Sequence, residues 1–302
     1  MRAASYPAPG KKERTMTIKS PPLFFTLGVF FSTAALLGGL SCSSEPKSVL
    51  LQMKYGSPGS SISYKFSADQ VGKVYSDSGL IRDFDVKVEG DIVYNTEDTL
   101  PGGGAIILEK NRWSWDEPAD DSGQVKRVTQ EYAYRVEMLA DGKVVSLEML
   151  NKPSQQSEDY VRNFAQQANP VFPHQRVAPG FNWLQTVPVE LVDGTVDTSK
   201  MTFKLKGIAR KMGYECAILE YSGNLVLPVF PNPDDTVAVS GIDRIDISGI
   251  SYMAIDAGII VTSDERRRTD REREYVGEKG KRTRRSDIES VMNFELVGTK
   301  GG

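Results

Sequence analysis

Alternation of apolar and polar residues with a period of two runs through most of this chain and constrains its fold more than any other feature. The pattern occupies the stretches 62–66, 83–89, 132–138, 203–206 and 292–296. Successive side chains of a strand point to opposite faces, so each stretch has one apolar and one polar face. This is typical of antiparallel sheets that pack on one face and meet water on the other. Such stretches predict about ten to twelve strands.

One segment follows a helical period instead. Over 157–168 the apolar residues lie three and four positions apart, two acids stand in the first turn, and Asn169-Pro170 ends the segment. The chain is therefore predicted to contain about five strands, one helix and about six further strands. An antiparallel sheet of this size must curl, split or close. We expect a mainly β fold, a large curved antiparallel sheet (half-barrel) wrapped around the helix between two runs of strands.

Glycine dipeptides separate several of the predicted strands. They are Asp141-Gly142, Asp193-Gly194, Met212-Gly213 and Ala257-Gly258. Glycine readily adopts the positive φ that tight hairpin turns require. We therefore expect a turn at each of these four positions.

The first 41 residues have the composition of an export signal. No charged residue lies between Lys19 and Glu45, and the apolar run Leu23–Leu37 follows a basic cluster near residue 12. Small residues then precede Cys42, and this junction resembles that of bacterial lipoprotein signals. In that family the cysteine is acylated and becomes the new N-terminus. The resemblance implies a signal peptide over 1–41, lipidation at Cys42 and a lipid-anchor tether over 42–61.

The same resemblance bears on location. Ser43, rather than aspartate, follows the cysteine, which in the family implies the periplasmic face of the outer membrane. An uncleaved transmembrane anchor is the alternative, because Leu23–Leu40 is 18 residues long and near the lower limit for crossing a bilayer. Both alternatives tether a domain to a membrane outside the cytoplasm. The start codon also stays open, since Met16 begins a more compact signal than Met1.

Three later passages resemble uncharacterised bacterial lipoproteins. They are NPVFPHQRVAPGFNW at Asn169–Trp183, GYECAILEY at Gly213–Tyr221 and ISYMAIDAGIIVT at Ile250–Thr262. The resemblance implies one β-rich domain over 62–298, similar in fold to the lipoprotein-localisation (LolA/LolB-like) carriers. Those carriers hold acyl chains or other apolar ligands on a concave face, so an apolar ligand is expected here. The candidate lining residues are Trp113, Trp115, Tyr132, Tyr134 and Phe164.

The composition leaves few catalytic options. One histidine and two cysteines exclude zinc sites of the Cys/His type and leave little scope for a nucleophile with a histidine base. His174 is expected in an exposed loop, and Cys216 in a packed strand without a disulfide partner. We therefore predict no enzymatic activity, with no catalytic residue, no metal and no cofactor. The alternative is a carboxylate-based hydrolase, with acids at 116–117 and 120–121 beside two tryptophans.

The stretch 264–285 is the strongest charge anomaly of the chain. It holds ten basic and six acidic residues, whereas the whole chain has a net charge of -3. It predicts a charged, protruding hairpin that turns near residues 277–280. The hairpin is either a solvated extension or an arm that contacts lipid headgroups or a protein partner, since arginine pairs with phosphate through two parallel hydrogen bonds. The arginines concerned are Arg266, Arg267, Arg268, Arg271, Arg273, Arg282, Arg284 and Arg285.

Two functional hypotheses result. The first is a membrane-anchored, non-enzymatic lipoprotein of the cell envelope that holds an apolar ligand against its concave sheet. The second is a structural or assembly lipoprotein that binds an envelope protein through the arginine hairpin and has a filled core. An open inner face would favour the first hypothesis, and a filled interior the second. Nucleic acid is not expected as a partner of a chain with so small a net charge outside the cytoplasm.

Overall fold

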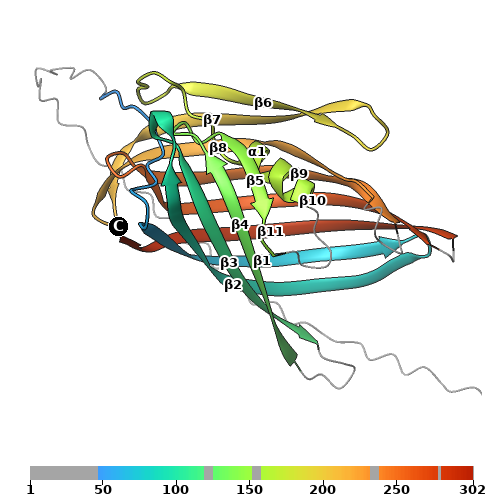
Figure 1. Ribbon diagram of the computed structural model, residues 1–302. Helices are drawn as coiled ribbons and strands as arrows, with labels where there is room; N and C mark the ends of the chain where they lie inside the picture. The colour runs from blue at the N-terminus through green and yellow to red at the C-terminus, as the bar shows by residue number, and fades with distance from the viewer. Residues whose placement is uncertain (1–46, 119–124, 152–157, 232–237, 278–279, 302) are drawn as a thin grey trace, which may run out of the picture. The chain divides into compact units, whose positions relative to one another are not determined.

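The computed structural model describes residues 47–118, 125–151, 158–231, 238–277 and 280–301 (Figure 1). Helix α1 spans Glu158–Ala168, and a short 3-10 turn spans Pro101–Gly103. The strands before the helix are β1 (Ser61–Ser76), β2 (Gly79–Thr99), β3 (Ala105–Pro118), β4 (Val125–Met138) and β5 (Val144–Met149). The strands after it are β6 (Asn182–Glu190), β7 (Val196–Lys211), β8 (Tyr214–Val229), β9 (Ala238–Ala254), β10 (Ile259–Gly277) and β11 (Gly280–Lys300).

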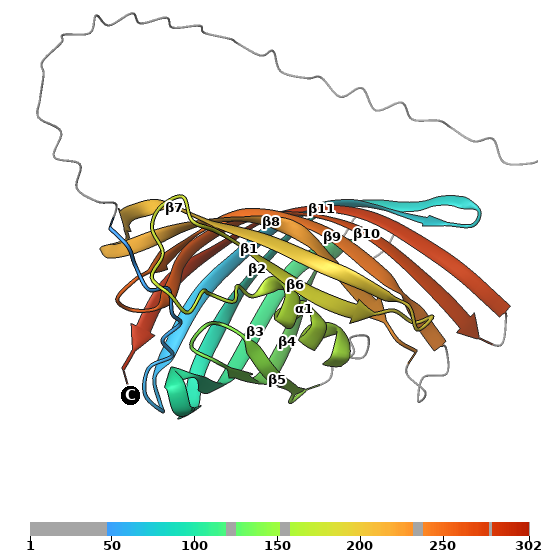
Figure 2. The same ribbon diagram turned by 90° about the horizontal axis from the view of Figure 1, so that it is seen from above.

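The eleven strands form one antiparallel sheet in the order β5-β4-β3-β2-β1-β11-β10-β9-β8-β7-β6. Neighbouring strands are also consecutive along the chain except at the centre, where β1 pairs with β11. The sheet is not closed, because β5 and β6 form its two edges. Figure 2 shows the sheet as an arch with α1 inside the curve. The predicted fold class, a curved antiparallel half-barrel with one helix between two runs of strands, is confirmed.

The four predicted turns are also present. Met212 and Gly213 have φ angles of 49° and 85° and form a two-residue hairpin between β7 and β8. Gly142, Gly194 and Gly258 likewise have positive φ angles at the other three turns. The dipeptides therefore mark true strand reversals, and the registers on either side of them follow from the turn geometry.

Glycines on the inner face allow neighbouring strands to approach large side chains. An added Cβ at Gly90 would overlap the Arg112 carbonyl oxygen and press on the Trp113 ring of the adjacent strand. At Gly72 a Cβ would collide with the Phe84 ring in the same way. A glycine that is covered by a large neighbouring side chain is a common device for bending a sheet. These glycines therefore contribute to the arch seen in Figure 2.

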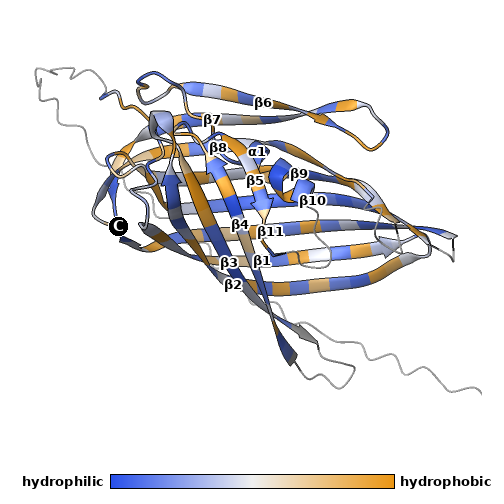
Figure 3. Ribbon diagram, viewed as in Figure 1, coloured by the Kyte–Doolittle hydropathy of each residue, from blue (hydrophilic) through white to orange (hydrophobic). Residues whose placement is uncertain are grey.

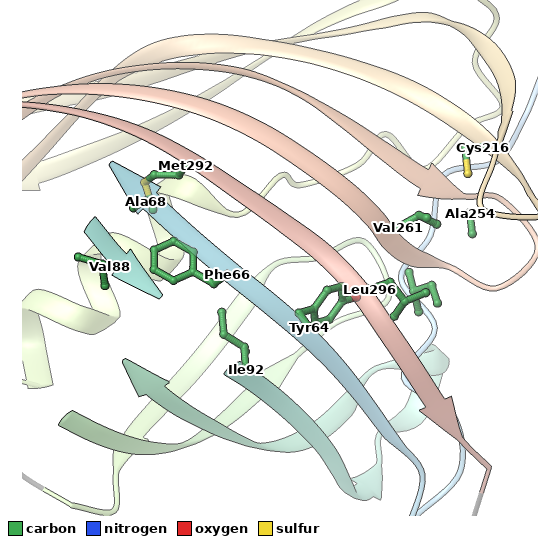
Figure 4. Close-up of a cluster of buried hydrophobic side chains, with 11 residues drawn as sticks. Tyr64, Phe66, Ala68, Val88, Ile92, Cys216, Ala254, Val261, Met292 and Leu296 are labelled. Carbon is green, nitrogen blue, oxygen red and sulfur yellow. The ribbon is translucent and has the colours of Figure 1, made fainter. Parts of the chain in front are cut away.

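The core lies on the inner face of the arch. Its central cluster comes from strands far apart in sequence and includes Tyr64, Phe66, Val88, Met292 and Leu296 (Figure 4). Figure 3 shows the alternating hydrophobic and hydrophilic bands along β1 and β2 that place these side chains on one face. The alternation seen in the sequence therefore corresponds to a packed inner face and a polar outer face.

The segment before β1 covers one end of this inner face. Val49 and Val177 exchange two backbone hydrogen bonds of 2.8 Å, and Leu51 packs in the same buried cluster as Met253. Tyr55 is buried against β3, and its hydroxyl donates to the Leu139 carbonyl oxygen over 3.2 Å. Residues 49–55 are thus part of the folded domain. The predicted signal peptide and Cys42 lie outside the described residues.

Candidate functional site

Helix α1 fills one side of the arch. One face of the helix, with Tyr160, Phe164 and Ala168, packs against buried residues of β7, β8 and β9. The neighbouring face of the helix, with Val161 and Ala165, packs against β4 and β5. The helix therefore bridges the two wings of the sheet and keeps their inner faces apart.

A buried ionic cluster fixes the start of the helix. The Asp243 side chain of β9 is fully buried, and its carboxylate accepts a 2.7 Å hydrogen bond from the Tyr160 hydroxyl. Arg271 and Arg273 of β10 pair with the same carboxylate at 3.1 and 2.6 Å. Burial acts to raise the pKa of the Asp243 carboxyl, but the two guanidinium charges outweigh burial and lower this pKa below its usual value. The carboxylate is therefore ionised and holds sheet and helix together.

Two glutamines fix the rest of the helix. The Gln167 amide is buried, donates to the Val226 carbonyl oxygen over 2.9 Å and accepts from the Val226 amide over 3.1 Å. Gln167 thus provides hydrogen-bond partners for the backbone of β8 at a point where β8 is no longer paired with β7. The Gln185 amide donates to the Gln166, Gln167 and Asn169 carbonyl oxygens over 3.1–3.3 Å. Carbonyl groups at the C-terminal end of a helix have no partner within the helix, and Gln185 supplies one here. Helix α1 is therefore held at both ends.

The inner face beyond the helix is less covered. The long strands β1, β2, β10 and β11 extend past α1 (Figure 2). There the inner side chains of Val74, Phe84, Val86 and Ile288 are all partly exposed, whereas deeper in the arch buried side chains such as Val88 and Met292 alternate with partly buried ones. We call this surface, defined by Val74, Phe84, Val86 and Ile288, the distal strip. It is the part of the inner face at which a ligand could lie without displacing α1.

The predicted aromatic set lies on the inner side of the arch but within its packed part. Trp113 lies between Phe66 and Tyr132, with ring centroids 5.7 and 5.4 Å apart. Tyr132 stacks on Tyr134, and both are buried against α1. Trp115 packs on the central cluster, and Phe164 lies in the cluster beneath the helix. The sequence placed these residues on the correct face; their contact with a ligand stays a prediction.

Two polar atoms in this packed region lack a partner among the described residues. They are Asn111 Oδ1 and Trp113 Nε1, both buried and two positions apart on the inner face of β3. Asn111 also donates to Glu109 over 2.7 Å, and burial raises the pKa of the Glu109 carboxyl. Sequence patterning predicted the tryptophan position but gave no sign of this polar site inside the core.

The arginines of 264–285 divide between the two faces of β10 and β11. Arg267 pairs with Glu265 and stacks on Phe164, and Arg271 and Arg273 bind Asp243, so these three stabilise the fold. The exposed outer positions carry Arg266, Arg268 and Arg285. Arg282 and Arg284 stand on the inner side near the hairpin tip. The hairpin is also paired on both flanks, with β9 and β1, over most of its length. It protrudes only at its tip.

The remaining candidates do not form a catalytic constellation in the described residues. His174 is exposed and lies 3.5 Å from Asp141, far from any nucleophile and base arrangement. Cys216 is a buried free cysteine of the central cluster, and burial raises the pKa of its thiol. Asp116 is exposed and pairs with Arg127, while residues 120–121 lie outside the described residues.

The outer face carries a polar hollow of about 510 Å³ over β11, β1, β2, β3 and β4. Arg127 lies in this hollow and bridges Glu89 and Asp116 at 3.4 and 3.2 Å. The hollow mixes acidic and basic side chains on an exposed surface, where single ion pairs contribute little energy. The distal strip offers an apolar surface instead, so it is the candidate site for an apolar ligand.

Comparison with known proteins identifies no family. No protein-family model matches the chain, and no curated protein sequence matches it significantly. A solved structure titled "Lipid-protein interactions in lipovitellin" is similar over 81% of this chain and 26% of that chain, with 11% identity and a TM-score of 0.37. This chain thus spans about a quarter of that protein's length, and a likeness at this level supports no functional argument. The resemblance to bacterial lipoproteins stays a prediction.

Within the part of the chain that the structure describes, no helix has both the length and the apolar character needed to cross a bilayer.

Proposed function

We propose that this protein is a membrane-anchored, non-enzymatic lipoprotein of the cell envelope that binds an apolar ligand on the distal strip. The observation that supports the ligand site is an unclosed sheet whose inner face is only partly covered by α1 and residues 49–55. Val86 and Phe84 lie next to the packed central cluster, so an acyl chain on the strip would extend an existing apolar surface. The sequence around Cys42 supports the anchor and the periplasmic face of the outer membrane.

The ligand can be sought on the protein purified from membranes in mild detergent. We expect native mass spectrometry to show a mass beyond the acylated chain that is lost on denaturation. Val86→Asp places a charge on the strip and should remove this mass. Val71→Asp, on the exposed outer face of the neighbouring strand β1, is the matched control and should retain it. A bare wild-type chain, or equal loss in both variants, would contradict a ligand on the strip.

The anchor makes a separate prediction. In the Cys42→Ser variant we expect no acylation and no cleavage at residue 42, because the acylated thiol is the group on which lipoprotein processing acts. Intact mass analysis should show an unprocessed chain without acyl chains, and the wild type should begin at Cys42. Ser43→Ala is the control and should be processed normally. A wild-type chain that retains residues 1–41 would support the uncleaved transmembrane alternative.

A second candidate function is an assembly lipoprotein that binds an envelope protein. The observation in its favour is the exposed outer row of Arg266, Arg268 and Arg285. Arg268 and Arg285 pair with Asp270 and Glu272 at 3.9 and 3.6 Å, whereas Arg266 has no acidic partner in the described residues. A partner captured by the wild type and lost in Arg266→Glu, with no ligand on the strip, would favour this function.

A further inference from the structure

The charges at the far end of the sheet are segregated by face. On β10, the inner positions after Glu265 carry only basic or neutral residues up to Tyr275, whereas all the later acids, at 270, 272 and 274, occupy outer positions. On β11, Arg282 and Arg284 are inner, and the acids Asp287 and Glu289 are outer. The inner side of the arch is therefore basic next to the distal strip, although the segment as a whole is mixed.

The inner arginines differ in their partners. Arg267, Arg271 and Arg273 are neutralised by Glu265 and Asp243. Arg282 and Arg284 on β11 and Arg82 on β2, in contrast, have no acidic partner within the described ranges. Of these three, Arg284 and Arg82 each lie over an aromatic ring.

Both guanidinium groups lie over an aromatic ring. Arg284 lies 5.3 Å from the centroid of the Tyr275 ring, and Arg82 lies 6.0 Å from that of Phe84. A guanidinium that stacks with its face keeps its N–H groups free at the edge, where they can bind a carboxylate or phosphate with two parallel hydrogen bonds. Both groups are thus available to an anion.

The strand register brings the two arginines toward the same surface. Arg82 is paired with Val74 of β1, and Arg284 with Ser76 of β1, so the two arginines flank β1 at adjacent inner positions. Adjacent strands are about 4.8 Å apart, which places the backbones of β2 and β11 about 10 Å from each other. Val74 and Ser76 are short, and two long guanidinium side chains can converge above them on one anionic group.

An apolar surface begins directly beside this pair. Phe84 and Val86 continue along β2, and Ile288 along β11, toward the buried Val88 and Met292. The order from the tip inward is therefore arginines without an acidic partner, then partly exposed apolar side chains, then the packed core. This order matches a molecule with a charged head and a hydrocarbon chain.

We propose that the distal strip binds an amphiphile with one anionic head group, which Arg82 and Arg284 hold while the chain lies along Phe84, Val86 and Ile288. The proposal rests on the proposed function and specifies its ligand class. The head group is a carboxylate or a phosphate monoester, because both fit the edge of a guanidinium.

The test is a native mass spectrometry titration of the acylated protein, freed of co-purified ligand, with oleate, oleyl phosphate and oleyl alcohol. The three probes share one hydrocarbon chain and differ only in the head. We expect the anionic probes to bind at least about tenfold more tightly than the alcohol, since hydrogen bonds to charged groups contribute this much. Arg82→Gln and Arg284→Gln should each lower the affinity for the anionic probes about tenfold and leave the alcohol unchanged. Arg266→Gln and Arg268→Gln, which remove a charge from the outer face of the same hairpin, are the controls.

Each outcome has a distinct meaning. If Arg82→Gln and Arg284→Gln weaken the binding of oleate alone, the head group is a carboxylate. If they weaken the binding of oleyl phosphate alone, it is a phosphate. Equal binding of all three probes by the wild type, or equal losses in the outer-face controls, would overturn the head-group site while leaving the apolar site in place. Displacement of the probes by inorganic phosphate alone would show a site for the free anion and overturn the amphiphile. Failure of all three probes to bind would overturn the proposed function itself.

Discussion

Asp243→Ala will lower the free energy of unfolding by about 3–5 kcal/mol, because removing one partner of a buried ion pair leaves the other charge buried without compensation. The substitution leaves Arg271 and Arg273 without their shared carboxylate and removes the acceptor of the Tyr160 hydroxyl. Urea unfolding followed by circular dichroism measures the loss. Asp246→Ala, at an exposed outer position of the same strand, is the matched control and should change stability by less than about 1 kcal/mol. Equal losses in the two variants would show that the cluster does not hold the helix.

The same cluster gives the protein an acid-sensitive component of stability. The folded-state pKa of Asp243 lies below its unfolded value, so the carboxylate stabilises the fold fully above the unfolded pKa of about 3.9. The stabilisation is lost as the pH falls from there through the lower folded-state pKa. The difference in unfolding free energy between wild type and Asp243→Ala should therefore shrink in strong acid and be constant near neutral pH.

Gly223→Ala should destabilise the protein by about 2–3 kcal/mol, at the upper end of the cost of overpacking. A Cβ at this position of β8 would overlap the Lys200 carbonyl oxygen and press on Met201 in the adjacent strand. The carbonyl belongs to the sheet backbone and cannot rotate away as a side chain would. Thermal unfolding measures the effect.

Gly207→Ala is the control for this substitution. Gly207 lies on β7, where an added Cβ meets no atom within 4 Å, so the melting temperature should stay the same or rise slightly. If the two variants changed the melting temperature equally, the inner glycines would not be needed for the close approach of neighbouring strands.

The sequence predicted those aspects of the fold that depend on local periodicity and turns. The number of strands, the helix near 157–168 and the hairpin turns all follow from residues close together in the chain. The face of the tryptophans was also correct, because alternation on one strand decides it. The same alternation also separates the inner from the outer arginines of 264–285, although the net charge of the segment does not show it.

The contacts that organise the site could not be predicted in this way. Gln167 and Gln185 are ordinary polar residues in sequence, and their roles depend on where β7 and β8 part and where the helix ends. The pairing of Asp243 with Arg271 and Arg273 requires the register of β9 against β10. The placement of Arg82 and Arg284 on either side of β1 requires β1 to lie between β2 and β11, which no local signal specifies.

That central pairing has a consequence for how the chain reaches its fold. Each wing of the sheet is built from hairpins and can form from contacts that are close in sequence, which is the fast kind of folding. The two wings meet only where β1 joins β11, the first and last strands described, and loop closure makes such a long-range step slow. Until β11 has emerged, β1 presents a long unpaired edge, which is a hazard for aggregation. The native sheet therefore depends on delayed assembly, and a chaperone that shields β1 during synthesis or transport would act at the right place.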